Sequence, residues 1–361
     1  MFLCIIEVIY FFFCIFADKI KMLVMNHDCL LSIIVPVYNV EKYIRACIES
    51  IFRQNLDDNV FEVIIVNDGT TDHSMELIQD IIREHPNISV ITQRNLSLSV
   101  ARNNGIEKAK GEYVLMPDSD DLLIDNSLLP LLKIAVASKV DLLVADFLEM
   151  TDKEIDQITT ISQLQMNIKE KTGRELFLED LNPHQCYVWR TLYRRDFIIN
   201  NDLKFIPGIR YQDVPFTHEC YLKADKCLRV NWLLNIYRRG HESATFSFDK
   251  KKAKDLCISI ASTWKLREIE GLPDYVRKKL NNNIFVSFTL LIYLMLYGIK
   301  NVKDRREIFA FLRREVPDLK FSDGLKQKVT FWLFNLSPTF YFFIRQLLKW
   351  RTPKPNLGLG V

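Results

Sequence analysis

Downstream of an apolar amino terminus, the chain repeats one hydrophobic pattern. Short runs rich in Ile and Val, LSIIVPVYN (31–39) and FEVIIVNDG (61–69), are typical of strands buried on both faces. Each is followed by apolar residues at helical spacing, in EKYIRACIESIF (41–52) and TTDHSMELIQDII (70–82). The pattern therefore predicts two strand–loop–helix units in succession.

The pattern continues through the next forty residues. A third predicted strand, ISVIT (88–92), precedes a helical stretch, SVARNNGIEKA (99–109), and a fourth, GEYVLM (111–116), runs directly into PDSDD (117–121). Strands that alternate with helices predict an α/β fold, with a mostly parallel, Rossmann-like sheet flanked by helices on both faces. In such sheets, ligands bind at the carboxyl ends of the strands.

Polar residues gather at these predicted strand ends, namely Asn39, Asp68, Gly69 and the run from Asp118 to Asp121. Taken singly, each is ordinary turn or loop chemistry. Their recurrence after successive strands favours one shared site. An Asp-x-Asp pair offers the carboxylate oxygens that Mg²⁺ or Mn²⁺ prefers, and such an ion leaves room for phosphate oxygens. The sequence thus predicts a divalent metal ion that holds a nucleotide diphosphate.

Composition narrows the class of protein. The 361 residues are 48% hydrophobic, which is enough for about two domains with sizeable cores. A net charge of +3 without a Lys/Arg-rich run argues against nucleic acid as a partner. The eight cysteines show no CxxC pair and no zinc spacing, so we expect buried thiols of a reducing compartment.

The first 29 residues are treated apart from the fold. MFLCIIEVIYFFFCIF (1–16) is strongly apolar but lacks a basic start and a small-residue cleavage site, and Glu7 interrupts it. It is also short for a membrane span. Two explanations stay open: upstream sequence translated from a misassigned start, with Met22 or Met25 as the true one, or a membrane anchor.

The last third of the chain, residues 250–361, carries no further strand-end motif and predicts a helical region. Within NIFVSFTLLIYLMLYGI (283–299), a fully apolar run of about sixteen residues would rise about 24 Å, less than the ~30 Å hydrocarbon core, which favours a buried or interfacial helix over a span. VTFWLFNLSPTFYFFIRQLLKW (329–350) sets aromatic residues beside Lys and Arg, as suits a membrane interface. Peripheral membrane contact and a helical core that covers the acceptor side are the two expectations.

Four motifs, in this order and at these intervals, resemble the nucleotide-sugar domain of family 2 glycosyltransferases, which have the GT-A fold: SIIVPVYN, VIIVNDGTTD, NLSLSVARNNGI and GEYVLMPDSDD. The resemblance covers residues 30–150, the expected nucleotide-sugar-binding half. It extends less closely over residues 151–249, which resemble the acceptor-side segment of bacterial members that build surface polysaccharides. It implies an inverting transfer of a sugar from a nucleotide-diphosphate donor to a glycan or lipid-linked glycan acceptor, in the cytoplasm at the inner face of the plasma membrane.

The resemblance also implies roles for single residues. The expected contacts with the nucleotide come from Pro36, Tyr38, Asn39, Asp68, Gly69, Arg102, Asp118 and Asp121. Asp68 would meet the base and Arg102 would lie beside the nucleotide. Asp120 is the expected metal ligand, with Asp118 next to it and nearer the ribose, and Asp121 extends the site toward the sugar.

The general base is expected at Asp213, in YQDVPF, where it would accept a proton from the acceptor hydroxyl. A helix cap is the alternative for this residue, because an acidic residue before an apolar periodic run is a common start signal. Arg238 and His241 are candidates for contact with the diphosphate or the acceptor, and a solvated basic loop is their alternative. Three residues depart from the family pattern: Ser97 stands where relatives carry Gly, Gln212 replaces a common Glu, and Pro117 stands where an apolar residue such as Leu is more usual.

Two other functions remain open from the sequence. A sugar nucleotidyltransferase uses a related architecture, although no Gly-rich, Lys-bearing loop follows the first strand. A non-catalytic nucleotide-sugar-binding protein would use the same pocket without transfer.

Overall fold

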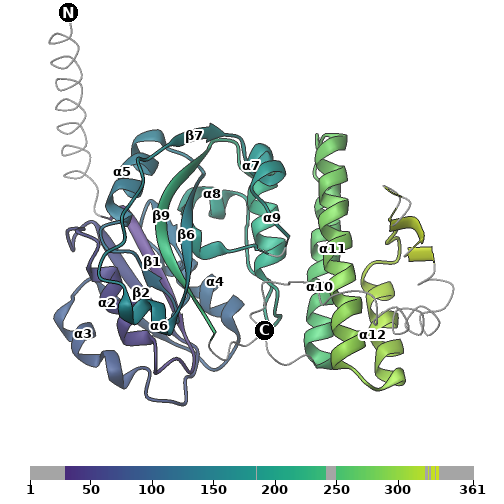
Figure 1. The fold of residues 1–361 in the computed structure, drawn as a ribbon, viewed down its shortest axis with the longest axis horizontal. Helices are drawn as coiled ribbons and strands as arrows, with labels where there is room; N and C mark the ends of the chain where they lie inside the picture. The colour runs from purple at the N-terminus through teal and green to yellow at the C-terminus, as the bar shows by residue number, and fades with distance from the viewer. Residues whose placement is uncertain are drawn as a thin grey trace, which may run out of the picture. The chain divides into compact units, whose positions relative to one another are not determined.

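The computed structural model describes residues 29–183, 185–240, 249–321, 324, 327–329 and 331–332 (Figure 1). Within this part the chain forms two compact units that interleave in sequence. The first contains the chain up to Lys171, Trp189–Asp202 and Lys226–Arg238. The second contains Thr172–Val188, Leu203–Asp225 and the chain from Arg239 onward. The boundaries predicted at residues 150 and 249 stay predictions.

A nine-stranded sheet runs through the first unit in the order β3-β2-β1-β4-β8-β6-β9-β5, with β7 paired to β9. The parallel strands are β1 (Leu31–Val37), β2 (Phe61–Asn67), β3 (Ile88–Thr92) and β4 (Tyr113–Leu115). The remaining strands are β5 (Leu122–Leu123), β6 (Leu142–Thr151), β7 (Ile168–Lys171), β8 (Thr191–Arg194) and β9 (Cys227–Arg239). The four strands predicted first are therefore confirmed, and so is the mostly parallel α/β sheet. The antiparallel pairs that β8 and β9 form lie beyond what the alternation predicted.

Helices flank this sheet on both faces, as predicted. They are α2 (Ile44–Phe52), α3 (Gln79–Glu84), α4 (Leu98–Lys108), α5 (Leu128–Ser138), α6 (Asp152–Gln157) and α8 (Arg195–Asn200), with short 3₁₀ turns η1 (Glu76–Ile78) and η2 (Val188–Arg190). The helix expected from residue 70 begins later, at Glu76. The residues before it form a hydrogen-bonded loop instead.

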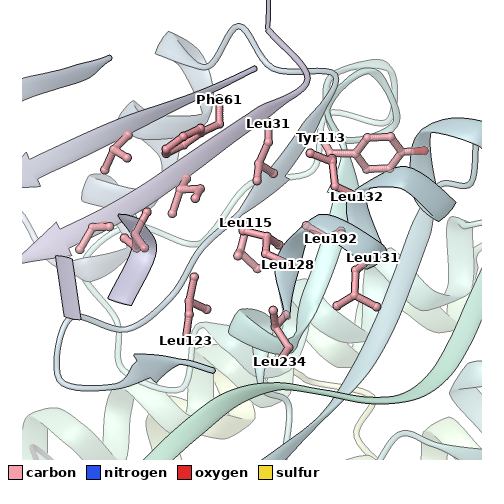
Figure 2. Packing of buried hydrophobic residues seen from close by; sticks show 14 of the residues in the cluster. Leu31, Phe61, Tyr113, Leu115, Leu123, Leu128, Leu131, Leu132, Leu192 and Leu234 are labelled. Carbon is pink, nitrogen blue, oxygen red and sulfur yellow. The ribbon is translucent and has the colours of Figure 1, made fainter. Parts of the chain in front are cut away.

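Alternation along β1 assigns the two faces. Leu31 and Ile33 join the main hydrophobic cluster, which also contains Ile48 of α2 and other leucines of α5 and β4 (Figure 2). Ile34 points to the opposite face and meets α4 at Gly105, where an added Cβ would lie 2.3 Å from Ile34 Cγ2. Only glycine permits this close approach, which seats α4 and its Arg102 against the sheet.

The second unit is helical among its described residues. Its elements are α7 (Gly173–Glu179), α9 (Asp213–Lys223), α10 (Lys250–Lys265), η3 (Leu266–Glu268), α11 (Asp274–Gly298) and α12 (Val302–Glu315). α10 packs against α9, α11 and α12, and α7 packs against α9 and α11. The predicted helical character of the carboxyl-terminal region is confirmed as far as the structure describes it.

One described helix, α11, is long and apolar enough to cross a membrane by length and composition. Its most apolar window is 56% buried within the structure, which a core helix also shows. The apolar amino terminus (1–28) and nearly all of the aromatic run 329–350 lie outside the described residues.

Five of the six described cysteines match the prediction of buried thiols, and the sixth, Cys29, is only partly buried. Cys47, Cys186, Cys220, Cys227 and Cys257 are buried free thiols. Such residues pack as small apolar side chains.

Candidate functional site

Three carboxylates meet just beyond the carboxyl end of β4. One oxygen each of Asp118, Asp120 and Asp121 lies within 4.8 Å of the others, and we call this group the acidic cluster. β4 is buried along its length, so the chain leaves the core at the strand-end edge with these residues following at once. The structure thus brings the predicted acidic residues together.

Asp121 is the buried member of the acidic cluster, with 1% of its surface exposed. Its Oδ1 accepts the backbone N–H of Arg238 at 2.8 Å, whereas its Oδ2 is buried without a hydrogen-bond partner among the described residues. Burial, followed by the negative charges of Asp120 and Asp118, raises the pKa of Asp121 well above its usual range. An orphaned carboxylate oxygen in an oxygen-only donor set fits a hard divalent cation such as Mg²⁺ or Mn²⁺.

Arg102 anchors the first carboxylate of the cluster. Its side chain is 2% exposed, and Nη2 donates to Asp118 Oδ1 at 2.5 Å. A buried guanidinium needs such a partner, and its positive charge balances the negative charge of Asp118. Cys47 of α2 lies behind the same turn, with Sγ 3.6 Å from the carbonyl oxygen of Asp118.

Asp68, at the end of β2, organises the loop that leads into α4. Its Oδ1 accepts hydrogen bonds from Gln93 Nε2 at 2.7 Å and from the N–H of Leu96 at 2.8 Å. Its Oδ2 accepts the N–H of Ser97 at 3.0 Å. A carboxylate offers about four lone-pair directions, so these three bonds leave one for a ligand. The expected contact with the base stays a prediction.

Ser97 carries backbone strain at this same loop. Its φ of 105° and ψ of 155° lie in a region that is essentially restricted to glycine. The neighbouring Gly69 has φ +71°, and an added Cβ there would lie 2.9 Å from the backbone N of Asn95. A glycine at position 97 would avoid the strain that Ser97 shows here.

The loop after β1 is held to the loop after β2 by side chains. Asn39, with φ 52°, accepts the N–H of Thr71 at 2.9 Å through Oδ1 and donates its own N–H to Thr70 Oγ1 at 2.8 Å. Asp72 Oδ2 accepts the N–H of Glu41 at 2.9 Å. Burial opposes ionisation of Asp72, but hydrogen bonds from Ser74, Thr70 and backbone N–H groups together lower its pKa to about 2.

The other residues singled out from the sequence differ in their exposure. Pro36 is buried within β1, and Tyr38 beside it is 43% exposed. Trp189 is 2% exposed and stacks on Tyr237 at 5.6 Å, which is core packing. His241 lies outside the described residues.

Asp213 belongs to the second unit and is the first residue of α9. Gln212 before it is 6% exposed, and its Oε1 is buried without a hydrogen-bond partner among the described residues. The turn is fixed from behind, since Ser259 Oγ of α10 donates to the carbonyl oxygen of Tyr211 at 3.0 Å. A carboxylate at a helix amino terminus is favoured by the helix dipole. Gln212 occupies the cap position of α9, so the alternative of Asp213 as the helix cap is wrong, and its role as general base stays a prediction.

His218 supports α9 from its buried face. Its Nδ1–H donates to the carbonyl oxygen of Val214 at 2.7 Å, and its Nε2 accepts from Asn283 Nδ2 of α11 at 3.1 Å. Burial lowers the pKa of His218 to about 4. Cys186 Sγ lies 3.8 Å from Nδ1, and burial, followed by the charge of Asp213, raises the pKa of that thiol well above its usual range. This Cys–His–Asn group is therefore a neutral packing element, because its thiol stays protonated.

Sequence reasoning missed two arrangements in the first unit. Asp125, which follows the acidic cluster in sequence, pairs with Arg53 Nε at 2.8 Å, and the residue that precedes α5 is Ser127. Arg238, a candidate for contact with the diphosphate or the acceptor, is 7% exposed and bonds to the acidic cluster, so the alternative of a solvated basic loop is wrong for this residue. The signal for this contact is the pairing of β5 with β9, which a single sequence does not display.

Comparison with known proteins agrees with this geometry. The family model described as "Glycosyl transferase family 2" matches residues 32–200. The chain is 36% identical to the uncharacterized glycosyltransferase EpsJ of Bacillus subtilis over 222 residues, which are 60% of this chain and 63% of that protein. It is 35% identical to the putative glycosyltransferase EpsH of the same species over 261 residues, 70% of this chain and 73% of the relative.

A solved structure shows the same fold. The crystal structure of S. aureus TarS 1-349 in complex with UDP-GlcNAc superposes with a TM-score of 0.64 at 19% identity, covering 80% of this chain and 82% of that one. The chain spans less than two thirds of EpsJ, and 58% of the E. coli relative YibD, a second uncharacterized glycosyltransferase. The matches to EpsH and to the family model are matches in sequence, so the family assignment does not rest on similarity of fold alone. The chain belongs to the family 2 glycosyltransferases.

Proposed function

We propose that the protein transfers a sugar from a nucleotide-diphosphate donor to a glycan or lipid-linked glycan acceptor, with inversion, in surface polysaccharide synthesis. The observation that carries this proposal is the acidic cluster at the carboxyl end of β4, with Arg102 buried beside it. In a doubly wound sheet this edge is where a nucleotide binds. The membership in family 2 supports the same reaction class.

The acidic cluster would hold a divalent cation through Asp120, with Asp118 next to it. When bound, such an ion would stabilise the negative charge on the departing diphosphate. Asp121 would extend the oxygen surface toward the sugar, and Arg102 would keep Asp118 in place. The nucleotide itself would lie against Pro36, Tyr38, Asn39, Asp68 and Gly69, with Asp68 meeting the base.

Asp213 would act as general base. Its carboxylate would accept the proton of the acceptor hydroxyl as that oxygen attacks the anomeric carbon. Attack from the face opposite the diphosphate inverts the anomeric centre through a transition state of oxocarbenium character. The rigid turn around Tyr211, bonded to Ser259, supports this role because a base must be held in one geometry.

The comparisons do not favour the alternatives. The named relatives are glycosyltransferases, and the loop from Tyr38 to Tyr43 contains no glycine with which to cradle a triphosphate. A nucleotidyltransferase would release pyrophosphate from a nucleoside triphosphate and a sugar phosphate. A binding protein would take up donor without hydrolysing it.

We also propose that the protein works at the inner face of a membrane, through peripheral contact. The α11–α12 turn supports this. Lys300, Lys303 and Arg306 are exposed there beside Tyr297, which is 39% exposed. The carboxylates of the same helix are neutralised elsewhere, since Asp304 and Glu307 pair with lysines of α10. Exposed basic residues with an aromatic neighbour suit an anionic bilayer surface.

Cosedimentation with phosphatidylglycerol vesicles tests the membrane contact. Reversing the three basic charges (Lys300→Glu, Lys303→Glu, Arg306→Glu) should release the protein from the vesicles, whereas Arg313→Glu, Arg314→Glu and Lys320→Glu at the other end of α12 should not. A chain truncated before residue 325 measures the share of the aromatic run. Equal binding by all three variants and the wild type would contradict the proposal.

Donor hydrolysis across a panel of UDP-, GDP- and dTDP-sugars with Mn²⁺ tests the proposed reaction. We expect one nucleotide sugar to be hydrolysed to nucleoside diphosphate and free sugar, faster with Mn²⁺ than with EDTA. Pyrophosphate release from nucleoside triphosphate, or tight donor binding with no hydrolysis and no transfer, would contradict glycosyl transfer.

A further inference from the structure

Strand pairing brings Arg238 to the acidic cluster. β5 and β9 are antiparallel, with Leu122 opposite Ile236 and Leu123 opposite Asn235. Continued by two residues, this register sets Arg238 opposite Asp120. The two residues are 118 apart in sequence, and the hydrogen bond between them confirms that they meet.

Arg238 contacts the turn of the acidic cluster at two points. Its backbone N–H donates to Asp121 Oδ1 at 2.8 Å, and its side-chain Nε donates to the carbonyl oxygen of Asp120 at 2.9 Å. The side chain is only 8% exposed. The main-chain N–H therefore holds the carboxylate of Asp121, and the guanidinium holds the backbone of Asp120, so that Arg238 fixes the turn from which both carboxylates project.

The charge of Arg238 is balanced outside the cluster. Its Nη1 donates to Asp152 Oδ1 at 2.5 Å, at the first residue of α6, and its guanidinium lies 4.8 Å from the ring centroid of Tyr43. Asp118 is in turn balanced by Arg102. A positive charge near a metal site repels a cation, and a carboxylate on its far side reduces that repulsion.

We propose that Arg238 and Asp152 form a brace that positions the Asp120–Asp121 turn and sets its affinity for a divalent cation, with Asp152 acting from outside the acidic cluster. Arg238 is then a positioning residue and not a diphosphate ligand. This inference rests on the proposed function, in that the acidic cluster is the cation site. The brace would act on the geometry of the acidic cluster before any donor binds.

Two effects of Arg238 on cation binding have opposite signs, and this makes the inference testable. As a bare positive charge Arg238 would weaken binding, so that Arg238→Gln would bind Mn²⁺ more tightly. As a brace it strengthens binding, so that Arg238→Gln would bind more weakly. Arg238→Lys keeps the charge and loses the planar fork, so a brace predicts weaker binding there too, and a pure charge effect predicts none.

The experiment measures Mn²⁺ binding to the full chain by electron paramagnetic resonance of the free ion, without nucleotide. We expect the dissociation constant to rise about tenfold in Arg238→Gln and in Arg238→Lys, as loss of one charge-assisted hydrogen bond implies. Asp152→Asn should raise it about threefold, by freeing the same guanidinium. The double variant Arg238→Gln/Asp152→Asn should bind no more weakly than Arg238→Gln alone, because both act through one contact.

The chain offers a matched control on the same strand. Arg229 of β9 pairs with Asp146 of β6, remote in sequence from the acidic cluster, so Arg229→Gln and Asp146→Asn should leave Mn²⁺ binding unchanged. Circular dichroism melts of all variants separate a local effect from loss of fold.

Three results would overturn the brace: tighter or unchanged Mn²⁺ binding in Arg238→Gln, unchanged binding in Asp152→Asn, or additive effects in the double variant. A wild-type chain that binds no Mn²⁺ with or without UDP would instead remove the cation site itself, and the brace with it. Loss of metal-free UDP binding in Arg238→Gln would point to a diphosphate contact and would likewise contradict the inference.

Discussion

The acidic cluster and the buried His218 of α9 differ in how their polar atoms are paired. In the first unit, Asp118, Asp120 and Asp121 crowd negative charge into one turn, and a buried oxygen of Asp121 is left without a partner. In the second unit, His218 is fully enclosed and has a carbonyl and an amide on its two nitrogens. The first arrangement favours a ligand of opposite charge, whereas in the second both ring nitrogens of His218 already have partners within the fold.

This difference separates a binding site from a structural support. We call His218, with its partners Val214 and Asn283, the α9 support. Negative charge that the fold leaves unbalanced favours binding of a cation, and this is why we propose the acidic cluster as the cation site. A neutral, satisfied histidine rigidifies its helix without attracting a ligand. Asp213 lies at the amino end of that supported helix, five residues before His218. The predictions below act on one region or the other.

The largest effect is expected at the proposed base. Asp213→Asn keeps the shape of the side chain but cannot accept a proton, so transfer should fall by about a thousandfold. Binding of UDP with Mn²⁺ should be unaffected. Initial rates of sugar transfer and calorimetric titration measure the two quantities. Asp225→Asn, an exposed carboxylate just after α9, is the matched control, and an equal loss of rate in that variant would contradict the assignment.

Loss of His218 should destabilise the fold. His218→Ala removes a fully buried ring and leaves the amide of Asn283 and the carbonyl of Val214 without their partner. We expect unfolding free energy to fall by about 3 kcal/mol, from the cavity and the unmet hydrogen bonds together. Urea melts followed by circular dichroism give this value. Unchanged stability would mean that α9 does not depend on this histidine.

As the pH falls, the α9 support should lose stability at a higher pH than the loop around Asp72 does. The pKa of His218 is about 4 when folded and about 6.5 when unfolded, so the unfolded chain binds the extra proton between these values. Stability from this residue is thus complete above pH 6.5 and declines as the pH falls, by about 2 kcal/mol at pH 5. The carboxylate of Asp72 has a folded pKa of about 2, so its contribution is present above pH 4 and is lost only below that.

Hydrogen exchange at pH 7.5 and pH 5 distinguishes the two regions. Amides of α9 should lose protection at pH 5, while those of the loop around Asp72 should keep it. Equal protection of α9 at both values would show that His218 is protonated in the folded chain.

The smallest effect concerns backbone strain in the first unit. Ser97→Gly relieves a conformation that serine rarely adopts, and the gain exceeds the extra chain entropy of glycine. We expect stabilisation of about 1 kcal/mol. Thermal melts check the sign, with Ser99→Gly inside α4 as a control that should destabilise.

Much of the first unit could be predicted because its strands are local signals. The Ile and Val runs at 31–37 and 61–67 identify β1 and β2 without reference to any partner. β5 could not be predicted, since it is two residues long and exists only by pairing with β9. For the same reason the contact of Arg238 with Asp120 was not readable.

The site shows the same division. The acidic cluster was predictable because its members are neighbours in sequence and strand ends are where such sheets bind ligands. The three hydrogen bonds to Asp68 were not, because they come from backbone and side chains 25 to 29 residues away. Sequence thus indicated the members of the acidic cluster, and only the structure showed which polar groups the strand-end loops already use.

The most direct test of the donor site is the titration of UDP into the wild type and Asp120→Asn, with Mn²⁺ and with EDTA. We predict that Mn²⁺ strengthens UDP binding to the wild type by at least about tenfold, and that it leaves binding to Asp120→Asn at the level seen with EDTA. The same gain from Mn²⁺ in both proteins would contradict the assignment of the acidic cluster as the place where the donor diphosphate meets its cation.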